Sequence, residues 1–256
     1  MNDTPEKPVY RVNTDAEMRQ ASQRAQNTFR FFWRELSWEY RRIIPALQMS
    51  AVKTMFADRP LDECGPADQV EQMWLKDVVF DGRVVTGKLL NQPNWLKSVR
   101  AGDLCSFPFE QLTDWMYAIS GRVYGAFTAN LMRSRMSVAG RREHDAAWGL
   151  QFGDPEKILL TTTGQTDEND ETEHPMSRNM APSLIKQLAI NRGLINRADK
   201  QGWTFLHRES LAGNATLVKI LLERGASRFL ETNAGDKAID FARLMRWQKI
   251  IALLSA

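Results

Sequence analysis

The 256-residue sequence contains little cysteine and little histidine. Its two cysteines, Cys64 and Cys105, are too few for a disulfide framework and lack the spacing of a metal site. The three histidines, His144, His174 and His207, lie far apart with no repeated spacing. We therefore predict a chain of a reducing compartment that binds no metal and needs no cofactor.

Long apolar runs are also absent. No stretch approaches the roughly 18 apolar residues that a membrane-spanning helix requires. The first ten residues are polar and include two prolines, so they lack the apolar core of a secretory signal. These features predict a cytoplasmic protein with no membrane partner.

The motifs of common enzymes are missing as well. The sequence has no Walker-type phosphate loop, no dinucleotide-binding glycine fingerprint and no His-Glu-x-x-His. Asp81 is explained by its turn, and Cys64 has no histidine near it in the sequence. We predict that the protein is not an enzyme. If it is one, Asp77, Asp114 and His144 are the candidate catalytic residues.

Aromatic side chains, by contrast, are plentiful. Eight tryptophans and twelve phenylalanines suffice for a well-filled core, and 43% hydrophobic with 25% charged residues is typical of a globular chain. From residue 15, apolar residues recur at steps of three and four up to Leu36, which predicts a helix that ends before Pro45. Its aromatic cluster, from Phe29 to Tyr40, is expected to pack in the core.

Strand signals follow this helix. Alternation over 47–54 predicts a strand, and Asp81-Gly82 between the runs 73–80 and 83–90 predicts a hairpin with a type I′ turn. Further elements are predicted as a strand at 102–108, a hairpin of 114–119 with 122–127, and helices at 129–136 and 140–150.

The order of these elements predicts an α+β domain over 15–162, with an antiparallel sheet and flanking helices. A flexible N-terminus, 1–14, is expected before it.

Charge is distributed unevenly along the chain. Residues 1–163 carry 21 lysines and arginines against 20 acids. The segment 164–173 has five acids and no base, which predicts a solvated acidic linker over 163–176. Residues 174–256 carry 13 bases against 6 acids. A basic region after an acidic one indicates an acidic partner, nucleic acid, or pairing of the two regions with each other.

The last third contains a repeat. The run from Asp199 to His207, with Gly213-Asn214 and a Leu-Leu-Glu-Arg-Gly-Ala end, resembles an ankyrin repeat. A second copy begins 33 residues later, where Gly235 corresponds to Gly202, and 33 is the ankyrin period. We predict an all-α array of about two and a half ankyrin units over 177–256. An array this short is expected to lean on the N-terminal domain.

The front of the chain resembles the YegJ-like family of uncharacterised bacterial domains over roughly 15–180. The resemblance implies a small α+β domain and brings no established catalytic residues. The segments that carry it include Phe32–Glu39, Met73–Asp77, Phe80–Gly82, Asp114–Tyr117, Tyr124–Thr128 and His144–Leu150.

An ankyrin array offers a rigid binding surface without catalytic groups. Joined to a non-catalytic domain, it is similar to the immunity proteins that neutralise secreted antibacterial toxins. We predict a protein-binding inhibitor that covers the active site of a cognate toxin effector or blocks its assembly, with type VI secretion as the setting and a nuclease among the candidate toxins. The alternatives are a cytoplasmic ankyrin adaptor for a housekeeping partner and an unrecognised enzyme. Nucleic acid is not an expected partner.

Partner contacts are expected at the hairpin tips and inner helices of the array. Trp203 either anchors the partner or packs against the preceding turn, since aromatic residues beside arginine are common interface anchors. The acidic segment either mimics phosphate toward a basic nuclease cleft or is only a solvated loop. The predicted partner-binding residues are Lys200, Gln201, Trp203, Arg208, Glu209, Asp236, Lys237 and Arg243. The candidate phosphate-mimic residues are Asp167, Glu168, Asp170, Glu171 and Glu173.

Overall fold

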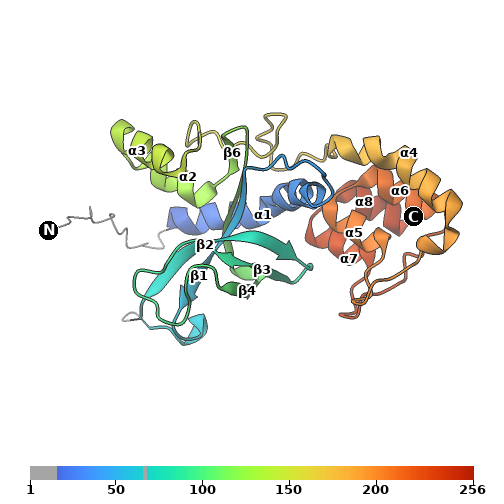
Figure 1. Cartoon of the computed structure of the whole chain (residues 1–256), viewed down its shortest axis with the longest axis horizontal. Coiled ribbons are helices and arrows are strands. Elements are labelled where there is room, and N and C mark those ends of the chain that lie inside the picture. The colour runs from blue at the N-terminus through green and yellow to red at the C-terminus, as the bar shows by residue number, and fades with distance from the viewer. Residues whose placement is uncertain (1–15, 66–67) are drawn as a thin grey trace.

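The computed structural model describes residues 16–65 and 68–256. The predicted flexible segment 1–14 lies outside the described residues. Figure 1 shows a sheet with helices around it, joined through one long helix to a group of C-terminal helices. An α+β region followed by helices agrees with the predicted fold class.

The helices and strands follow the hydrophobic pattern of the sequence closely. The strands are β1 (Met49–Ala57), β2 (Val70–Phe80), β3 (Val84–Leu89), β4 (Leu104–Pro108), β5 (Leu112–Ile119) and β6 (Arg122–Gly125). The α-helices are α1 (Ala16–Glu39), α2 (Phe127–Ser134), α3 (Val138–Trp148), α4 (Pro175–Ile190), α5 (Phe205–Ala212), α6 (Ala215–Glu223), α7 (Ala238–Leu244) and α8 (Gln248–Ser255). Short 3₁₀ turns are η1 (Leu61–Glu63), η2 (Phe109–Gln111) and η3 (Arg192–Leu194).

Within the described residues, six strands form one antiparallel sheet in the order β4-β3-β2-β1-β5-β6. The predicted first strand begins at Met49 rather than at residue 47 and extends to Ala57. The last predicted strand stops at Gly125, because Ala126 takes a left-handed conformation (φ 60°) that starts α2.

The turn at Asp81-Gly82 differs from the predicted type I′, which needs positive φ at both central residues. Only Gly82 has positive φ (+91°) there. The Asp81 carboxylate instead accepts hydrogen bonds from the backbone N–H groups of Arg83 (2.9 Å) and Val84 (2.7 Å), so the side chain directs the turn. Positive φ at both positions occurs at Ser120 and Gly121, in the second hairpin.

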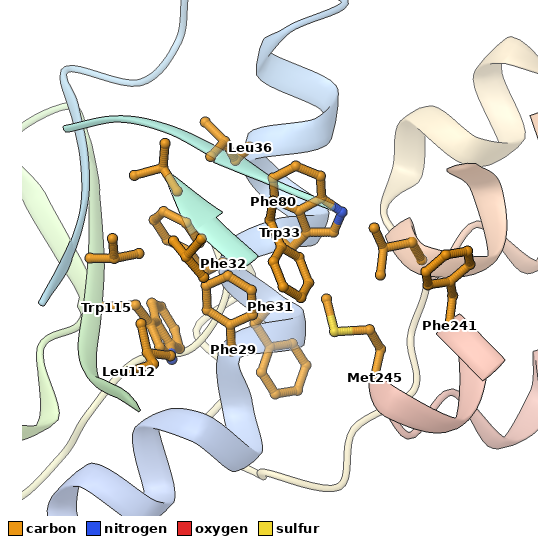
Figure 2. Packing of buried hydrophobic residues seen from close by; sticks show 14 of the residues in the cluster. Phe29, Phe31, Phe32, Trp33, Leu36, Phe80, Leu112, Trp115, Phe241 and Met245 are labelled. Atoms are coloured by element: carbon orange, nitrogen blue, oxygen red, sulfur yellow. The ribbon is translucent and has the colours of Figure 1, made fainter. Parts of the chain in front are cut away.

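Helix α1 packs on one face of the sheet through its aromatic residues. Phe29 and Phe32 are fully buried, and Phe29 meets Phe80 edge-on at 5.2 Å between ring centroids (Figure 2). The indole N–H of Trp115 donates to the carbonyl of Ala25 at 2.9 Å. Burying one such phenylalanine contributes roughly 1.5–3 kcal/mol. The expected aromatic core is therefore present, although Tyr40 is 57% exposed.

The C-terminal helices repeat with the predicted spacing of 33 residues. Thr204 precedes α5 and Lys237 precedes α7, and each pair of helices (α5 with α6, α7 with α8) packs together while α5 stacks on α7. His207, which is 1% exposed, accepts from the backbone N–H of Thr204 at Nδ1 (3.0 Å). Its Nε2 therefore donates to the carbonyl of Leu230 (3.0 Å). Burial lowers the pKa of His207, so it serves the fold as a neutral ring.

The larger apolar core runs from the sheet through α1 into the C-terminal helices. Phe31 meets Trp247 edge-on at 6.4 Å, and the indole N–H of Trp38 donates to the Asn214 side chain at 3.1 Å. Met245 and Phe241 face the same core (Figure 2). The short array thus leans on the N-terminal part, as its length predicts.

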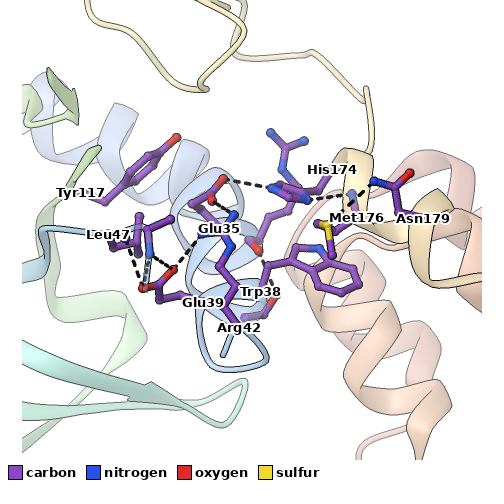
Figure 3. A network of polar contacts seen from close by, with 12 residues as sticks. Glu35, Trp38, Glu39, Arg42, Leu47, Tyr117, His174, Met176 and Asn179 are labelled. Carbon is purple, nitrogen blue, oxygen red and sulfur yellow. Dashed lines mark hydrogen bonds and ion pairs between the residues drawn. The ribbon is translucent and has the colours of Figure 1, made fainter. Parts of the chain in front are cut away.

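A buried polar network fixes α1 to the start of α4 (Figure 3). Glu35, which is 4% exposed, accepts from Arg42 at 3.0 Å and lies 3.3 Å from Nε2 of His174. The His174 ring stacks on Trp38 at 5.7 Å and accepts from the N–H of Met176, which caps α4. Burial alone would raise the pKa of Glu35, but the contacts with His174 and Arg42 outweigh it and hold that pKa below its usual range.

The first prediction concerns the contact between hairpin β2–β3 and α7. Gly82 (φ +91°) and Gly102 (φ +90°) share a left-handed backbone, but only a Cβ at Gly82 would meet a neighbour, 2.4 Å from the ring of Phe241. Gly82→Ala should lower the free energy of unfolding by about 1–3 kcal/mol more than Gly102→Ala in urea denaturation, because overpacking adds to the shared backbone penalty. Equal losses would mean that the hairpin and α7 separate at little cost.

The second prediction concerns pH. Because the pKa of Glu35 is lower in the folded than in the unfolded chain, its contribution is complete above the usual value of 4.5 and is lost as pH falls through the folded pKa. Glu35→Gln should reduce the free energy of unfolding by about 1–3 kcal/mol at pH 7, with the deficit shrinking below about pH 4. Exposed Glu143→Gln is the control. A deficit that persists unchanged in acid would contradict this role.

Candidate protein-binding surface

The tips of the two C-terminal loops lie against each other. The backbone N–H of Asn233 donates to the carbonyl of Gln201 (2.9 Å), and its side chain donates to the carbonyl of Lys200 (3.0 Å). The side chains of Lys200 and Gln201 are exposed. These two predicted contact residues therefore form a fixed, accessible tip.

Trp203 packs within the C-terminal helices. Its ring stacks on Phe241 with 4.5 Å between centroids and meets His207 edge-on. Arg208 is exposed, lies over the Trp203 ring and forms an ion pair with Asp199. Trp203 thus packs against the following unit rather than against the preceding turn, and its role as a partner anchor stays a prediction.

Two predicted contact residues face the N-terminal part of the same chain. Glu209 is 6% exposed and pairs with Arg41 at 3.0 Å, just beyond α1. Asp236 pairs with Arg83 of hairpin β2–β3 at 2.7 Å. In this structure, both carboxylates already bind within the chain. The remaining predicted residues form local pairs, Lys237 with Glu231 at 3.3 Å and Arg243 with Asp240 at 3.7 Å.

The acidic segment, residues 164–173, has no helix or strand, and α4 begins at Pro175, inside the predicted linker; the segment is bound to both parts of the protein. Glu168 pairs with Arg24 of α1 at 2.7 Å. Glu171 accepts from the N–H groups of Gln248 and Lys249 at the start of α8, and Glu173 accepts from the N–H of Thr216 in the first turn of α6 (2.9 Å). Carboxylates at helix N-termini satisfy free N–H groups and the helix dipole.

The other two acids of this segment shape its own backbone. Asp167 accepts from the N–H of Asn169 at 2.9 Å, and Asp170 accepts from the N–H of Thr172 at 3.1 Å. The segment thus braces the molecule, and its role as a phosphate mimic stays a prediction.

A surface that the sequence analysis missed lies at the end of α1. Ile43 is 99% exposed and Ile44 81% exposed. Their loop is held in place because the carboxylate of Glu39 accepts from the backbone N–H groups of Ala46 and Leu47 at about 3 Å. An isoleucine pair between charged residues and a proline is the sequence signal that could have revealed it.

An apolar cavity of about 290 Å³ lies between the end of α1 and the C-terminal helices. Arg41, two residues before Ile43, lines it together with Glu209. Its apolar lining comes from α1, α4, α5 and α6, namely Trp38, Met180, Leu184, Phe205, Leu217 and Leu221. We call Ile43, Ile44 and this cavity the junction surface.

The candidate catalytic residues are separated. Exposed Asp77 pairs with Lys88 at 3.1 Å, whereas His144 contacts Asp145 within α3 at 2.9 Å. Asp114 is fully buried. Among the described residues, no hydrogen bond or ion pair joins any two of the three candidates. Nor does the described chain contain a group of three or more His, Cys, Asp or Glu side chains placed to hold a metal ion.

The Asp114 side chain, from β5, instead caps the N-terminus of helix α2. Its carboxylate accepts from the N–H groups of Phe127 and Thr128, each at 2.8 Å, and from the Thr128 hydroxyl at 2.6 Å. Lys53 donates to the same hydroxyl (3.1 Å) and lies over the ring of Trp74. Burial raises the pKa of Asp114 and lowers that of Lys53. These contacts give the pair a structural role.

The fold and these contacts define a small α+β region joined to stacked helix pairs. The family described as "Uncharacterized protein conserved in bacteria (DUF2314)" matches residues 15–152, and the chain belongs to that family. In the part of the chain that the structure describes, no helix has the length and apolar character to cross a bilayer.

Two relatives support the predicted arrangement of the chain. "Putative ankyrin repeat protein NMB1133/NMB1171" of Neisseria meningitidis serogroup B is 41% identical over 96% of this chain and 95% of its own length. The uncharacterised protein YegJ of Escherichia coli K12 is 26% identical over 35% of this chain and 57% of YegJ, which confirms the predicted family resemblance.

The chain is also similar in part to a solved structure. It is a chain from the complex of the Bd0816 predatory endopeptidase of Bdellovibrio bacteriovorus with the immunity protein Bd3460. The identity is 23%, over 50% of this chain and 60% of the other, with a TM-score of 0.27. A TM-score this low carries no argument about function.

The third prediction follows from the packing of Trp203. Trp203→Ala should lower the free energy of unfolding by about 2–4 kcal/mol, because it removes the stack on Phe241. Lys200→Ala at the exposed tip should stay within about 0.5 kcal/mol of the wild type. Urea denaturation of both variants tests this, and a Trp203→Ala variant as stable as Lys200→Ala would show that the stack adds little.

Proposed function

We propose that the protein is a protein-binding inhibitor: an ankyrin-type immunity protein that binds a cognate bacterial toxin and neutralises it. The junction surface is the observation that carries this proposal. Two adjacent isoleucines that are 99% and 81% exposed present a contiguous apolar patch to solvent, and apolar patches of this kind mark interaction sites.

The junction surface has the features of an interface anchor. Glu39 holds the loop of Ile43 and Ile44 rigid, so binding loses little conformational entropy. The cavity at the end of α1 offers an apolar pocket for one large side chain of the partner. An exposed apolar pair and a pocket, both at the end of α1, offer a partner two anchor points.

Two features favour this class over an enzyme. The repeat of 33 residues and the name of the Neisseria relative support an ankyrin array, which acts by binding. The candidate catalytic residues have separate structural partners. Inhibition would then need no turnover, since a bound chain covers the active site of the toxin or prevents its assembly.

The setting that we propose is type VI secretion, with a nuclease among the candidate toxins. A housekeeping adaptor would use the same junction surface, so the two functions differ in the partner rather than in the geometry. Co-expression separates them.

The fourth prediction tests this function with a matched control. The tagged full-length chain, purified from its host, should recover one stoichiometric partner that arrests growth when expressed alone and is harmless with the wild type. Ile43→Ser with Ile44→Ser should weaken binding about 10-fold to 100-fold and abolish protection, because apolar anchors dominate interface energies. Val138→Ser, at an exposed position on α3, should protect like the wild type.

The thermal midpoint of the double variant should match the wild type, since both isoleucines are exposed. Recovery of a partner that is harmless on its own would favour the adaptor. Recovery of no partner would contradict both binding functions.

A further inference from the structure

The acidic residues of the C-terminal part that the structure describes all form ion pairs. In the described residues, each of the six acids after residue 174 has a basic nitrogen within 4.0 Å. The basic partners of Glu209 and Asp236 are Arg41 and Arg83, which belong to the N-terminal part. The C-terminal part therefore neutralises less of its own positive charge than its composition suggests.

The acidic segment neutralises only part of this positive charge. Glu168 is engaged by Arg24 of α1, and Glu171 by the start of α8. Glu173 caps α6 and lies 3.7 Å from Arg178. The pairing of the acidic segment with the basic region, one of the three expectations for this charge pattern, thus accounts for only part of the excess.

Part of the uncompensated positive charge lies on two neighbouring segments of the chain. Arg192, Arg197 and Arg224 are exposed and form no ion pair among the described residues. Arg192 and Arg197 follow α4 and Arg224 follows α6, and the side chain of Asn196 joins these two segments because it donates to the carbonyl of Gly225 (3.4 Å) and accepts from the N–H of Ser227 (2.8 Å). This bond holds the turn after α4 against the loop after α6.

The same two segments carry two large exposed apolar side chains. Ile190, the last residue of α4, is 77% exposed, and Phe229, two residues beyond Ser227, is 76% exposed. Arg228 is set apart from this group because its guanidinium donates to the carbonyl of Leu254 (3.3 Å). We call Ile190, Arg192, Arg197, Arg224 and Phe229 the basic face.

Resting on the proposed function, we infer that the basic face binds an acidic surface of the partner protein, and that this contact steers the two proteins together. Guanidinium groups bind carboxylates through paired hydrogen bonds, and apolar side chains on the same segments supply anchors. Nucleic acid fits less well, because three uncompensated arginines release few counterions and the rest of the chain is close to neutral.

A charge-reversal pair of variants tests this inference. The face variant carries Arg192→Glu, Arg197→Glu and Arg224→Glu. The control carries Arg100→Glu, Arg122→Glu and Arg142→Glu, three exposed arginines of the N-terminal part, and has the same net charge. The probe is the purified partner recovered in the co-expression experiment, and the association rate is measured at about 50 mM and about 300 mM salt.

At the lower salt, the face variant should associate at least about tenfold more slowly than the control, and the gap should narrow at higher salt because screening shortens the reach of the charges. Equal rates for the two variants, with the partner still bound, would overturn this inference and leave the proposed function intact. Failure to recover any partner would overturn both. A DNA duplex of about 20 base pairs that binds the wild type but not the face variant, while the partner binds both equally, would assign the face to nucleic acid.

Discussion

Helix α1 is the element on which the rest of the structure depends. It is apolar on the side that meets the sheet, where Phe29 and Phe32 are buried, and it also meets the C-terminal helices through Phe31 and Trp38. Since neither the sheet nor a short stack of helix pairs covers its own apolar surface, one helix completes both cores. Most of α1 beyond Ala25 is accordingly buried.

The central position of α1 leaves two of its arginines buried. Arg30 and Arg34 of α1 are each 5% exposed, and their guanidinium groups lie over the rings of Phe31 and Trp247. They donate to backbone carbonyls of the acidic segment, including that of Thr172 from Arg34. Burial lowers the pKa of both arginines, and these carbonyls together with the aromatic faces replace the lost water.

The elements were predictable because their signals are local. Apolar steps of three and four residues predicted α1, strand-type runs on either side of a turn predicted the hairpins, and the 33-residue period predicted the stacked pairs. The predicted turn at Asp81 failed because a side chain can direct a turn by binding backbone N–H groups, which leaves only Gly82 with positive φ.

The contacts of the candidate site were much less predictable, because their partners are distant in sequence. Glu209 pairs with a residue 168 positions away, and Asp236 with one 153 positions away. Glu209 lies within α5 and Asp236 in the loop before α7, and the local sequence around each shows nothing of these distant partners. Ile43 and Ile44 were missed for a related reason, since exposure depends on what packs nearby rather than on residue type.

The acidic segment also changes how the chain can be divided. It has the composition of a flexible connection, yet Glu171 and Glu173 supply acceptors to helices that lie tens of residues further along. Dividing the chain within this segment would remove the carboxylate acceptors from the first turns of α6 and α8. It would also expose Trp247 and the aromatic side of α1 to solvent. The change in composition at this segment therefore does not mark a boundary between independent domains, because both parts belong to one cooperative unit. The two parts are expected to have evolved together rather than as exchangeable modules.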